Sequence, residues 1–255
     1  MIIEYHRPKN IKEALILLAR EKPMSYPLGG GTTLNCGGEG DYAVIDLQSL
    51  GLGTISNKGN SLQVGAMVTL QGLLDYRGLP GDFYNVIEHE ATYNLRQMAS
   101  IAGRLVTATG RSPLATIMLA LNAEIELHEL DKKPEQVRIG DWLPLREKSR
   151  PGRLITMISI PSKVKMAYEY IARTPADLPI VCAAITQWEA GRTRLALGGW
   201  GSDPVLAFDG PNSDGIDIAG QSAYSLAEDE WASAEYRQEM AGILAMRCVK
   251  RINPE

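Results

Sequence analysis

The sequence is poor in the residues that most often bind metals. It has 255 residues but only three cysteines and three histidines. The cysteines form no CxxC pair, so neither an iron–sulfur cluster nor a structural zinc site is predicted within the chain. The histidines are scattered and form no His-Cys-carboxylate cluster, and we expect reduced thiols and no metal site. The residues concerned are Cys36, Cys182, Cys248, His6, His89 and His128.

The chain also lacks a basic surplus and a long apolar run. Its 26 lysines and arginines against 30 acidic residues give a formal net charge of −4, whereas nucleic-acid-binding proteins usually carry a basic excess. No apolar run approaches the roughly 20 residues that span a bilayer. The opening MIIEYHRPKN has no apolar core of a secretory signal. We therefore expect a cytoplasmic protein with no membrane span and no nucleic-acid partner.

What is present is the composition of a globular protein, with 45% hydrophobic and 22% charged residues. Helical and strand patterns are mixed along the chain, which predicts the α+β class. We expect two lobes, residues 1–52 and 53–161, and a smaller C-terminal α+β domain at 165–255. Expected helices begin near Asn10, Thr69, Asp82, Leu95, Pro113 and Ala227, and expected strands lie at 26–28, 43–47, 54–56, 61–66, 123–128, 153–160, 166–171, 179–188 and 193–197; residues 198–217 are expected to form a loop.

The first stretch with chemical potential is PLGGGTTLN, residues 27–35. Consecutive glycines let a ligand approach the backbone closely, and their N–H groups can form an anion-binding nest. The stretch fits neither the Walker pattern nor the GxGxxG pattern of a dinucleotide-binding fold. Taken alone, it is compatible with a phosphate-binding loop or with a simple turn.

The second stretch is ASIAGRLVTATGRSP, residues 99–113. Two glycine–arginine pairs, at Arg104 and Arg111, could bring N–H groups and a guanidinium to a phosphate. The alternative is a surface loop with solvated arginines.

An ordered series of stretches carries a resemblance to a known family. In chain order they read PLGGGTTLN, AVIDL, LQVGAMVTLQGLL, NLRQMASIAGRLVTATGRSPLATIMLALNAEIEL, GRLITMISIP and SAEYRQEMAGILAMR. The series resembles the FAD-binding medium subunit of molybdenum hydroxylases, the group that includes carbon monoxide dehydrogenase and xanthine dehydrogenase. The resemblance implies a two-lobed FAD-binding fold of the vanillyl-alcohol oxidase (PCMH) type, followed by a small C-terminal α+β domain.

The resemblance also implies a cofactor site. In that family two glycine-containing loops hold the FAD diphosphate, and an aliphatic and an aromatic residue lie near the flavin. Ordinary core packing is an equally good interpretation of the last two positions, Ile155 and Tyr168. The implied cofactor-binding residues are Leu28, Gly29, Gly30, Gly31, Thr32, Thr33, Leu34, Ser100, Ile101, Gly103, Arg104, Ile155 and Tyr168. A valine at Gly30 is expected to abolish flavin retention by occupying the place of the diphosphate.

Three positions depart from the family pattern. Ala102-Gly103-Arg104 stands where the family usually has Gly-Gly-Asn, so an arginine replaces an amide. Pro113 stands where the family has an aspartate that is expected to meet the ribose, and proline offers neither a side-chain acceptor nor an N–H. Glu169 stands where a basic residue is common. Arg104 could add a charge-assisted contact to the diphosphate or fill the pocket. The hydrogen bond lost at Pro113 is by itself expected to weaken FAD binding without abolishing it.

The implied function is that of an oxidoreductase subunit that transfers electrons through FAD and has no acid–base or nucleophilic residues of its own. The resemblance implies a small [2Fe-2S] subunit and a large molybdopterin subunit as partners, in a dimer of heterotrimers, with electrons passing from the clusters to an external acceptor. The alternative is a family member that has lost FAD and acts as a structural or docking subunit.

Overall fold

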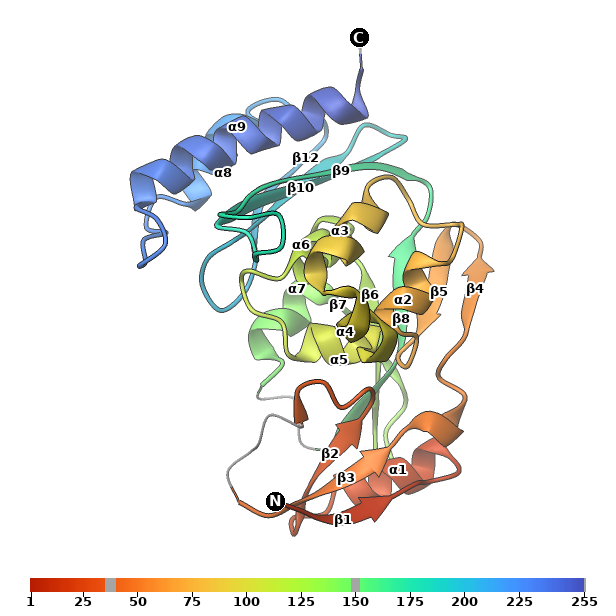
Figure 1. The fold of residues 1–255 in the computed structure, drawn as a ribbon. Coiled ribbons are helices and arrows are strands. Elements are labelled where there is room, and N and C mark those ends of the chain that lie inside the picture. Colours follow the sequence, from red (N-terminus) through yellow and green to blue (C-terminus); the bar gives the residue numbers. More distant parts are fainter. Residues whose placement is uncertain (35–39, 148–151, 255) are drawn as a thin grey trace. The chain divides into compact units, whose positions relative to one another are not determined.

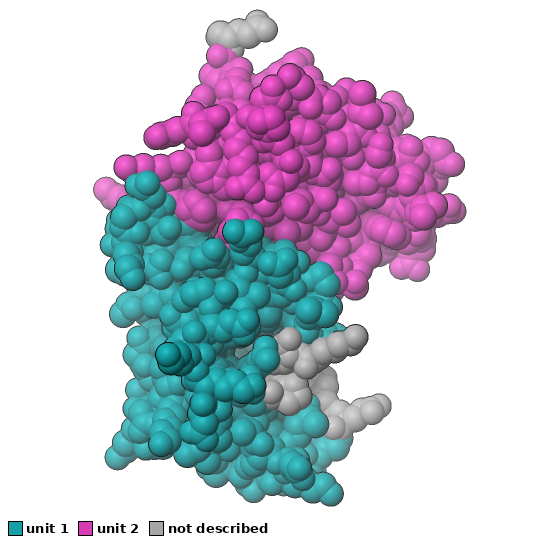
Figure 2. Space-filling view, turned by 180° about the vertical axis from the view of Figure 1, so that it is seen from behind, with its two compact units in different colours: residues 1–75, 93–107, 124–160 teal, residues 76–92, 108–123, 161–255 magenta. Residues whose placement is uncertain are grey.

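The computed structural model describes residues 1–34, 40–147 and 152–254. The chain divides into two compact units, each made of several segments (Figure 2). Unit 1 comprises residues 1–75, 93–107 and 124–160, and unit 2 comprises 76–92, 108–123 and 161–255. The last segment of unit 2 begins where the sequence predicts the end of the two lobes. The predicted boundaries of the domains stay a prediction.

Unit 1 begins with a three-stranded parallel sheet in the order β1-β3-β2 (Figure 1). Its strands are β1 (Ile2–His6), β2 (Met24–Leu28) and β3 (Tyr42–Asp46). Helix α1 (Ile11–Leu18) begins at the expected cap, where the Asn10 side chain accepts a hydrogen bond from the N–H of Glu13 at 2.9 Å. Ala14, Leu15 and Leu18 of this helix pack against Ile45 of β3. The short 3₁₀ helix η2 (Gln48–Leu50) follows β3.

A five-stranded sheet in the order β4-β5-β8-β6-β7 forms the rest of the strand structure of unit 1. Its members are β4 (Ile55–Lys58), β5 (Ser61–Gly65), β6 (Glu124–Glu129), β7 (Glu135–Arg138) and β8 (Arg153–Pro161). The pairs β4–β5, β6–β7 and β6–β8 are antiparallel. The other helices of this unit are α2 (Leu70–Leu74), α4 (Tyr93–Met98), α5 (Ile101–Val106), α7 (Ile139–Trp142) and the 3₁₀ helix η3 (Leu143–Leu145).

Unit 2 is built on an antiparallel sheet in the order β12-β11-β10-β9. The strands are β9 (Val164–Ile171), β10 (Val181–Trp188), β11 (Thr193–Gly198) and β12 (Val205–Gly210). Helices α8 (Ile216–Ala223) and α9 (Ala234–Ile252) cover one face, while α3 (Phe83–Glu90) and α6 (Pro113–Ala120) lie on the other (Figure 1). Side chains therefore alternate along β10: Ala183 and Ile185 join the core below α9, whereas Cys182 contacts Thr116 of α6.

Most expected helices and strands are present, and the mixed helix and strand composition is confirmed. Three differences have physical reasons. The helix expected across 95–105 is two helices, α4 and α5, because Ser100 caps α5 and its backbone bridges to Thr69. The strand β12 lies in the expected loop 198–217, since antiparallel pairing with β11 outweighs its weak local signal. The last helix begins at Ala234 and not at Ala227, because Asp229 accepts the N–H groups of Trp231 and Ala232 in a tight turn.

Candidate functional site

The glycine loop, residues 28–34, follows the end of β2 and is held by hydrogen bonds at Leu28 and at Leu34. The carbonyl of Leu28 accepts a hydrogen bond from the N–H of Leu47 at 3.2 Å, which extends the pairing with β3. The carbonyl of Leu34 accepts from the Tyr42 hydroxyl at 3.2 Å. Gly31 has φ of +68°, a conformation that glycine adopts without strain. Asn35, the last residue of the predicted stretch, lies outside the described residues.

Two glycines of this loop pack directly against the second predicted segment. A Cβ atom at Gly29 would lie 2.6 Å from the Ser100 hydroxyl oxygen, and one at Gly30 would overlap the carbonyl oxygen of Met98. Gly30 therefore requires glycine because it meets backbone, whereas a side chain at Gly29 would require the Ser100 side chain to move. The structure thus brings the first loop and the second segment together. A valine at Gly30 would first collide with the protein backbone, and not only with a ligand as expected from the sequence.

The backbone donors of the glycine loop are available for a ligand. Among the residues that the structure describes, no acceptor takes a hydrogen bond from the N–H groups of Gly29, Gly30 or Gly31. These three residues and Thr32 are half-buried, and Thr33 is exposed. A half-buried run of N–H groups with adjacent hydroxyls is the donor set that binds phosphate oxygens. On this observation the loop fits the diphosphate of FAD.

The second segment, Ser100 to Arg104, is not a loop but the start of helix α5. Its N–H groups already have partners within unit 1: Ile101 donates to the carbonyl of Val68 at 2.9 Å and Ala102 to that of Ala66 at 3.3 Å. The N–H of Gly103 donates to the Ser100 hydroxyl oxygen at 3.3 Å. The contribution of this segment to a ligand is consequently limited to side chains, the Ser100 hydroxyl and the half-buried Arg104.

Ile155 precedes Thr156, which is connected to this helix through two backbone hydrogen bonds. Ile155 lies in β8 with 7% of its surface exposed, opposite Leu127 of β6. The carbonyl of the next residue, Thr156, accepts from Ala66 at 3.0 Å, and the carbonyl of Ala66 accepts from Ala102. The predicted positions of unit 1 therefore belong to one continuous arrangement of backbone: the glycine loop, the start of α5 and the middle of β8.

Tyr168, the last predicted position, lies in β9 of unit 2. Its hydroxyl lies 3.0 Å from Nδ1 of His89, whose Nε2 lies 2.7 Å from the carbonyl oxygen of Asp177. Because a carbonyl only accepts, Nε2 carries the proton and Nδ1 accepts from Tyr168. Burial raises the pKa of Tyr168 well above its ordinary value. Next to it, Glu169 pairs with Arg251 at 2.9 Å, so the acidic departure from the family pattern has a basic partner in the same unit.

Pro113 also lies in unit 2, buried at the first position of α6. The carboxylate of Glu90, 4% exposed, accepts from the Ser112 hydroxyl at 2.8 Å and from the N–H of Leu114 at 2.9 Å. The N–H of Ala115 donates to the Ser112 hydroxyl oxygen at 3.1 Å. A protein carboxylate thus already occupies the positive end of this helix. The Gly110-Arg111 pair adds no guanidinium to this helix start, because Arg111 donates instead to the carbonyls of Leu178 and Pro179.

Sequence reasoning missed the residues that support the glycine loop. Met98 contributes its carbonyl oxygen, and Ala66 contributes its N–H and carbonyl groups. Tyr42, which is distant in sequence, contributes its hydroxyl. A backbone contact leaves no side-chain signature, and the only available signal was the run of glycines, which indicates close approach but not to what.

In ranges 1–34, 40–147 and 152–254, no three His, Cys, Asp or Glu side chains are grouped so as to hold a metal ion. No helix in those ranges has both the length and the apolar character to cross a bilayer.

The chain matches known proteins along nearly its whole length. It is 28% identical to YgfM of Escherichia coli K12, an uncharacterised protein, over 96% of this chain and 94% of that protein. It is 27% identical to the carbon monoxide dehydrogenase medium chain of Afipia carboxidovorans, covering 97% and 96% of the two chains. A structure of carbon monoxide dehydrogenase from Oligotropha carboxidovorans contains a chain that superposes with a TM-score of 0.78 at 25% identity, covering 98% and 96%.

The family model of the FAD-binding domain in molybdopterin dehydrogenase matches residues 1–163. This range includes all the described residues of unit 1 and so the glycine loop, the start of α5 and β8. The chain therefore belongs to the family of FAD-binding domains of molybdopterin dehydrogenases.

Proposed function

We propose that this chain is the FAD-binding electron-transfer subunit of a molybdopterin-dependent hydroxylase or dehydrogenase complex. The observation that carries the proposal is the glycine loop, whose three glycine N–H groups have no acceptor among the described residues and which is packed on Met98 and Ser100. Family membership identifies FAD as the cofactor to which such a donor set belongs.

In this proposal the residues of unit 1 bind and orient the cofactor. The N–H groups of Gly29, Gly30 and Gly31 and the hydroxyls of Thr32 and Thr33 hold the diphosphate oxygens, flanked by Leu28 and Leu34. Ser100 and Arg104 add a hydroxyl and a positive charge, while Ile101 and Gly103 shape the start of α5. Ile155 offers an apolar side chain, whereas Tyr168, which lies in unit 2, stays a prediction from the resemblance. FAD, when bound, supplies the redox chemistry, and the protein positions it.

Separate chains are proposed to carry the other redox centres. The relative from Afipia carboxidovorans is named a medium chain, that is, one chain of a larger enzyme, and it matches the present chain over nearly its full length. A small [2Fe-2S] subunit and a large molybdopterin subunit would pass electrons to the flavin, which passes them to an external acceptor. The proposed assembly is a dimer of such heterotrimers, and a cytoplasmic location stays a prediction.

The visible spectrum of the purified full chain, before and after FAD is added, tests the proposal. We expect flavin absorbance that stays with the protein through gel filtration and a rise in melting temperature with FAD, since a ligand that binds only the native state stabilises it. A colourless chain with no thermal shift would instead support the FAD-free structural subunit. Copurification of a tagged chain with an iron–sulfur and a molybdopterin chain tests the partners, and full activity of the chain alone would contradict them.

A further inference from the structure

Helix α9 carries a stripe of exposed residues that its own unit does not use. The stripe consists of Tyr236, Glu239, Ile243, Met246 and Lys250, all exposed. Successive members are three, four, three and four residues apart, which is the spacing of the seam along which two helices pack. We refer to these five residues as the α9 seam.

The opposite side of the helix is buried in the core of unit 2. Ala241, Leu244, Ala245 and Cys248 are buried against the sheet, and Arg237 is buried with its guanidinium bonded to the carbonyl oxygens of Ile180, Ala227 and Ala232 and to Asp229. The seam is therefore not an unsatisfied part of the core. Its exposed apolar side chains, Tyr236 at 40%, Ile243 at 37% and Met246 at 40%, face away from that core.

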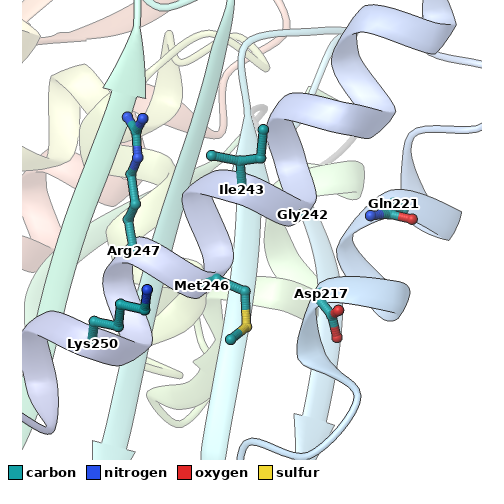
Figure 3. A pocket seen from close by; sticks show the side chains of 7 residues that line it. All are labelled: Asp217, Gln221, Gly242, Ile243, Met246, Arg247 and Lys250. Atoms are coloured by element: carbon teal, nitrogen blue, oxygen red, sulfur yellow. The ribbon is translucent and has the colours of Figure 1, made fainter.

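A groove runs beside the seam, between α8 and α9. It has a volume of about 360 Å³, with Ile243, Met246, Arg247 and Lys250 on the α9 side and Asp217 and Gln221 on the α8 side (Figure 3). Gly242 keeps the two helices close, since a Cβ there would lie 2.7 Å from Nε2 of Gln221.

The charges of α9 are arranged symmetrically about Ile243. Glu239 lies four residues before it and Arg247 four residues after it, while Tyr236 and Lys250 lie seven residues before and after it. Two copies of the helix crossing antiparallel at Ile243 would therefore place Glu239 of each opposite Arg247 of the other. Lys250 would meet Tyr236, and Ile243 would meet itself. A parallel arrangement would instead oppose like charges.

We propose that the α9 seam is a self-association surface, on which a second copy of this chain packs its own α9 antiparallel about a twofold axis through Ile243. Such an interface is isologous, because the same patch serves both copies. None of Glu239, Arg247 and Lys250 forms an ion pair with another residue that the structure describes, so their charges are available to the partner. A helix of 19 residues is about 28 Å long, which gives an interface at the small end of specific contacts and a dissociation constant on the order of micromolar.

The oligomeric state of the full chain tests this inference, by sedimentation velocity across a range of concentrations. The wild-type chain is expected to dimerise, and Ile243→Glu is expected to raise the dissociation constant at least about tenfold, because it brings two carboxylates together at the centre. Ile16→Glu is the matched control: Ile16 is an exposed isoleucine of α1 in unit 1 and is expected to leave dimerisation unchanged.

A charge exchange separates this geometry from other ways of dimerising. Glu239→Arg is expected to weaken the dimer about three- to tenfold, since each added arginine opposes Arg247 of the second copy. The double variant Glu239→Arg/Arg247→Glu restores opposite charges at both symmetric pairs and should return the dissociation constant to within about twofold of the wild-type value. A rescue of this kind occurs only where the two positions face each other across the twofold axis.

The inference does not depend on FAD or on the proposed partner subunits. FAD titration of Ile243→Glu distinguishes a loss of dimerisation from a loss of FAD binding. We expect the variant to bind FAD as the wild-type chain does. A chain that stays monomeric at concentrations on the order of 100 μM, well above a micromolar dissociation constant, would overturn the inference. So would a dimer that is unaffected by Ile243→Glu, or one that the double variant does not restore. If the seam were covered only when partner chains are present, the isolated chain would stay monomeric.

Discussion

Two regions of the molecule resemble phosphate sites in the sequence, and they differ in whether the protein itself already bonds their hydrogen-bond donors. In the glycine loop of unit 1, the N–H groups of Gly29, Gly30 and Gly31 have no acceptor among the described residues. At the start of α6 in unit 2, the hydroxyl of Ser112 and the N–H of Leu114 are both bonded to Glu90. The first region therefore retains donors for a ligand, whereas the second has satisfied them with its own carboxylate. A run of small and polar residues shows where donors can exist, and only the packing shows whether they are used.

The largest effect is expected where the glycine loop touches Met98. Gly30→Ala should destabilise unit 1 by about 3 kcal/mol or more and abolish flavin retention, because the new methyl group overlaps the backbone carbonyl of Met98. Hydrogen exchange of the β3 amides, read by mass spectrometry, measures the change in opening free energy. Gly29→Ala is the comparison: its methyl group meets only the rotatable Ser100 side chain, so a loss equal to that of Gly30→Ala would contradict the packing described.

The second largest effect is expected at Glu90. Glu90→Ala should destabilise unit 2 by about 2–3 kcal/mol, since it leaves a buried hydroxyl and a buried N–H without an acceptor. Glu90→Gln keeps one acceptor oxygen and should lose clearly less. Urea unfolding followed by exchange of the α6 amides gives both values. Equal stability of the alanine variant and the wild-type chain would mean that the helix start is not satisfied by Glu90.

Pro113→Asp tests whether the start of α6 can accept a second carboxylate beside Glu90. The change installs the acidic residue that the family pattern has at this position, but here it adds a second carboxylate to a buried site that already holds Glu90. We expect a loss of about 2 kcal/mol in unit 2 and no gain in FAD affinity. Pro113→Ala, which adds no charge, should cost under about 1 kcal/mol. A tighter complex with FAD in the aspartate variant would show that the departure at Pro113 does weaken the site.

Arg104→Glu tests the side-chain contribution of α5. If the guanidinium lies near the diphosphate, a carboxylate in its place should lower FAD affinity about tenfold, which corresponds to about 1.4 kcal/mol. Arg104→Asn, the residue typical of the family, should lower it less. Fluorescence titration with FAD measures both variants. An unchanged affinity in the glutamate variant would remove Arg104 from the site and leave the glycine loop as the source of charge stabilisation.

The smallest effect concerns pH and His89 in unit 2. Burial lowers the pKa of His89 below its ordinary value, outweighing the hydrogen bond to Asp177 and the nearby charge of Glu90. The unfolded chain therefore binds more protons than the folded chain between the depressed pKa and about 6.5, and stability falls as the pH drops through that window. His89→Phe should flatten this part of the stability profile. A steeper fall in the variant would mean that the sign is wrong.

The sequence allowed the fold class, most helices and strands and the glycine loop to be predicted, because these depend on local patterns. Asn10 and Thr69 cap helices as expected. The pairing of β1 with β3 and of β12 with β11 is set by contacts distant in sequence, and no local pattern indicates it. The same limit applies to the site: Ser100 to Arg104 resembles a glycine loop in sequence, yet the carbonyls of Ala66 and Val68 capture its N–H groups.

A comparison of flavins shows whether the glycine loop binds the diphosphate of FAD. Titration of the full chain with FAD, FMN and riboflavin separates the diphosphate from the ring, since only FAD carries both phosphates. We predict one FAD per chain and binding at least about tenfold weaker for FMN, because it lacks the second phosphate that the glycine N–H groups would hold. Equal affinity for FAD and riboflavin, or no binding of FAD, would contradict the account.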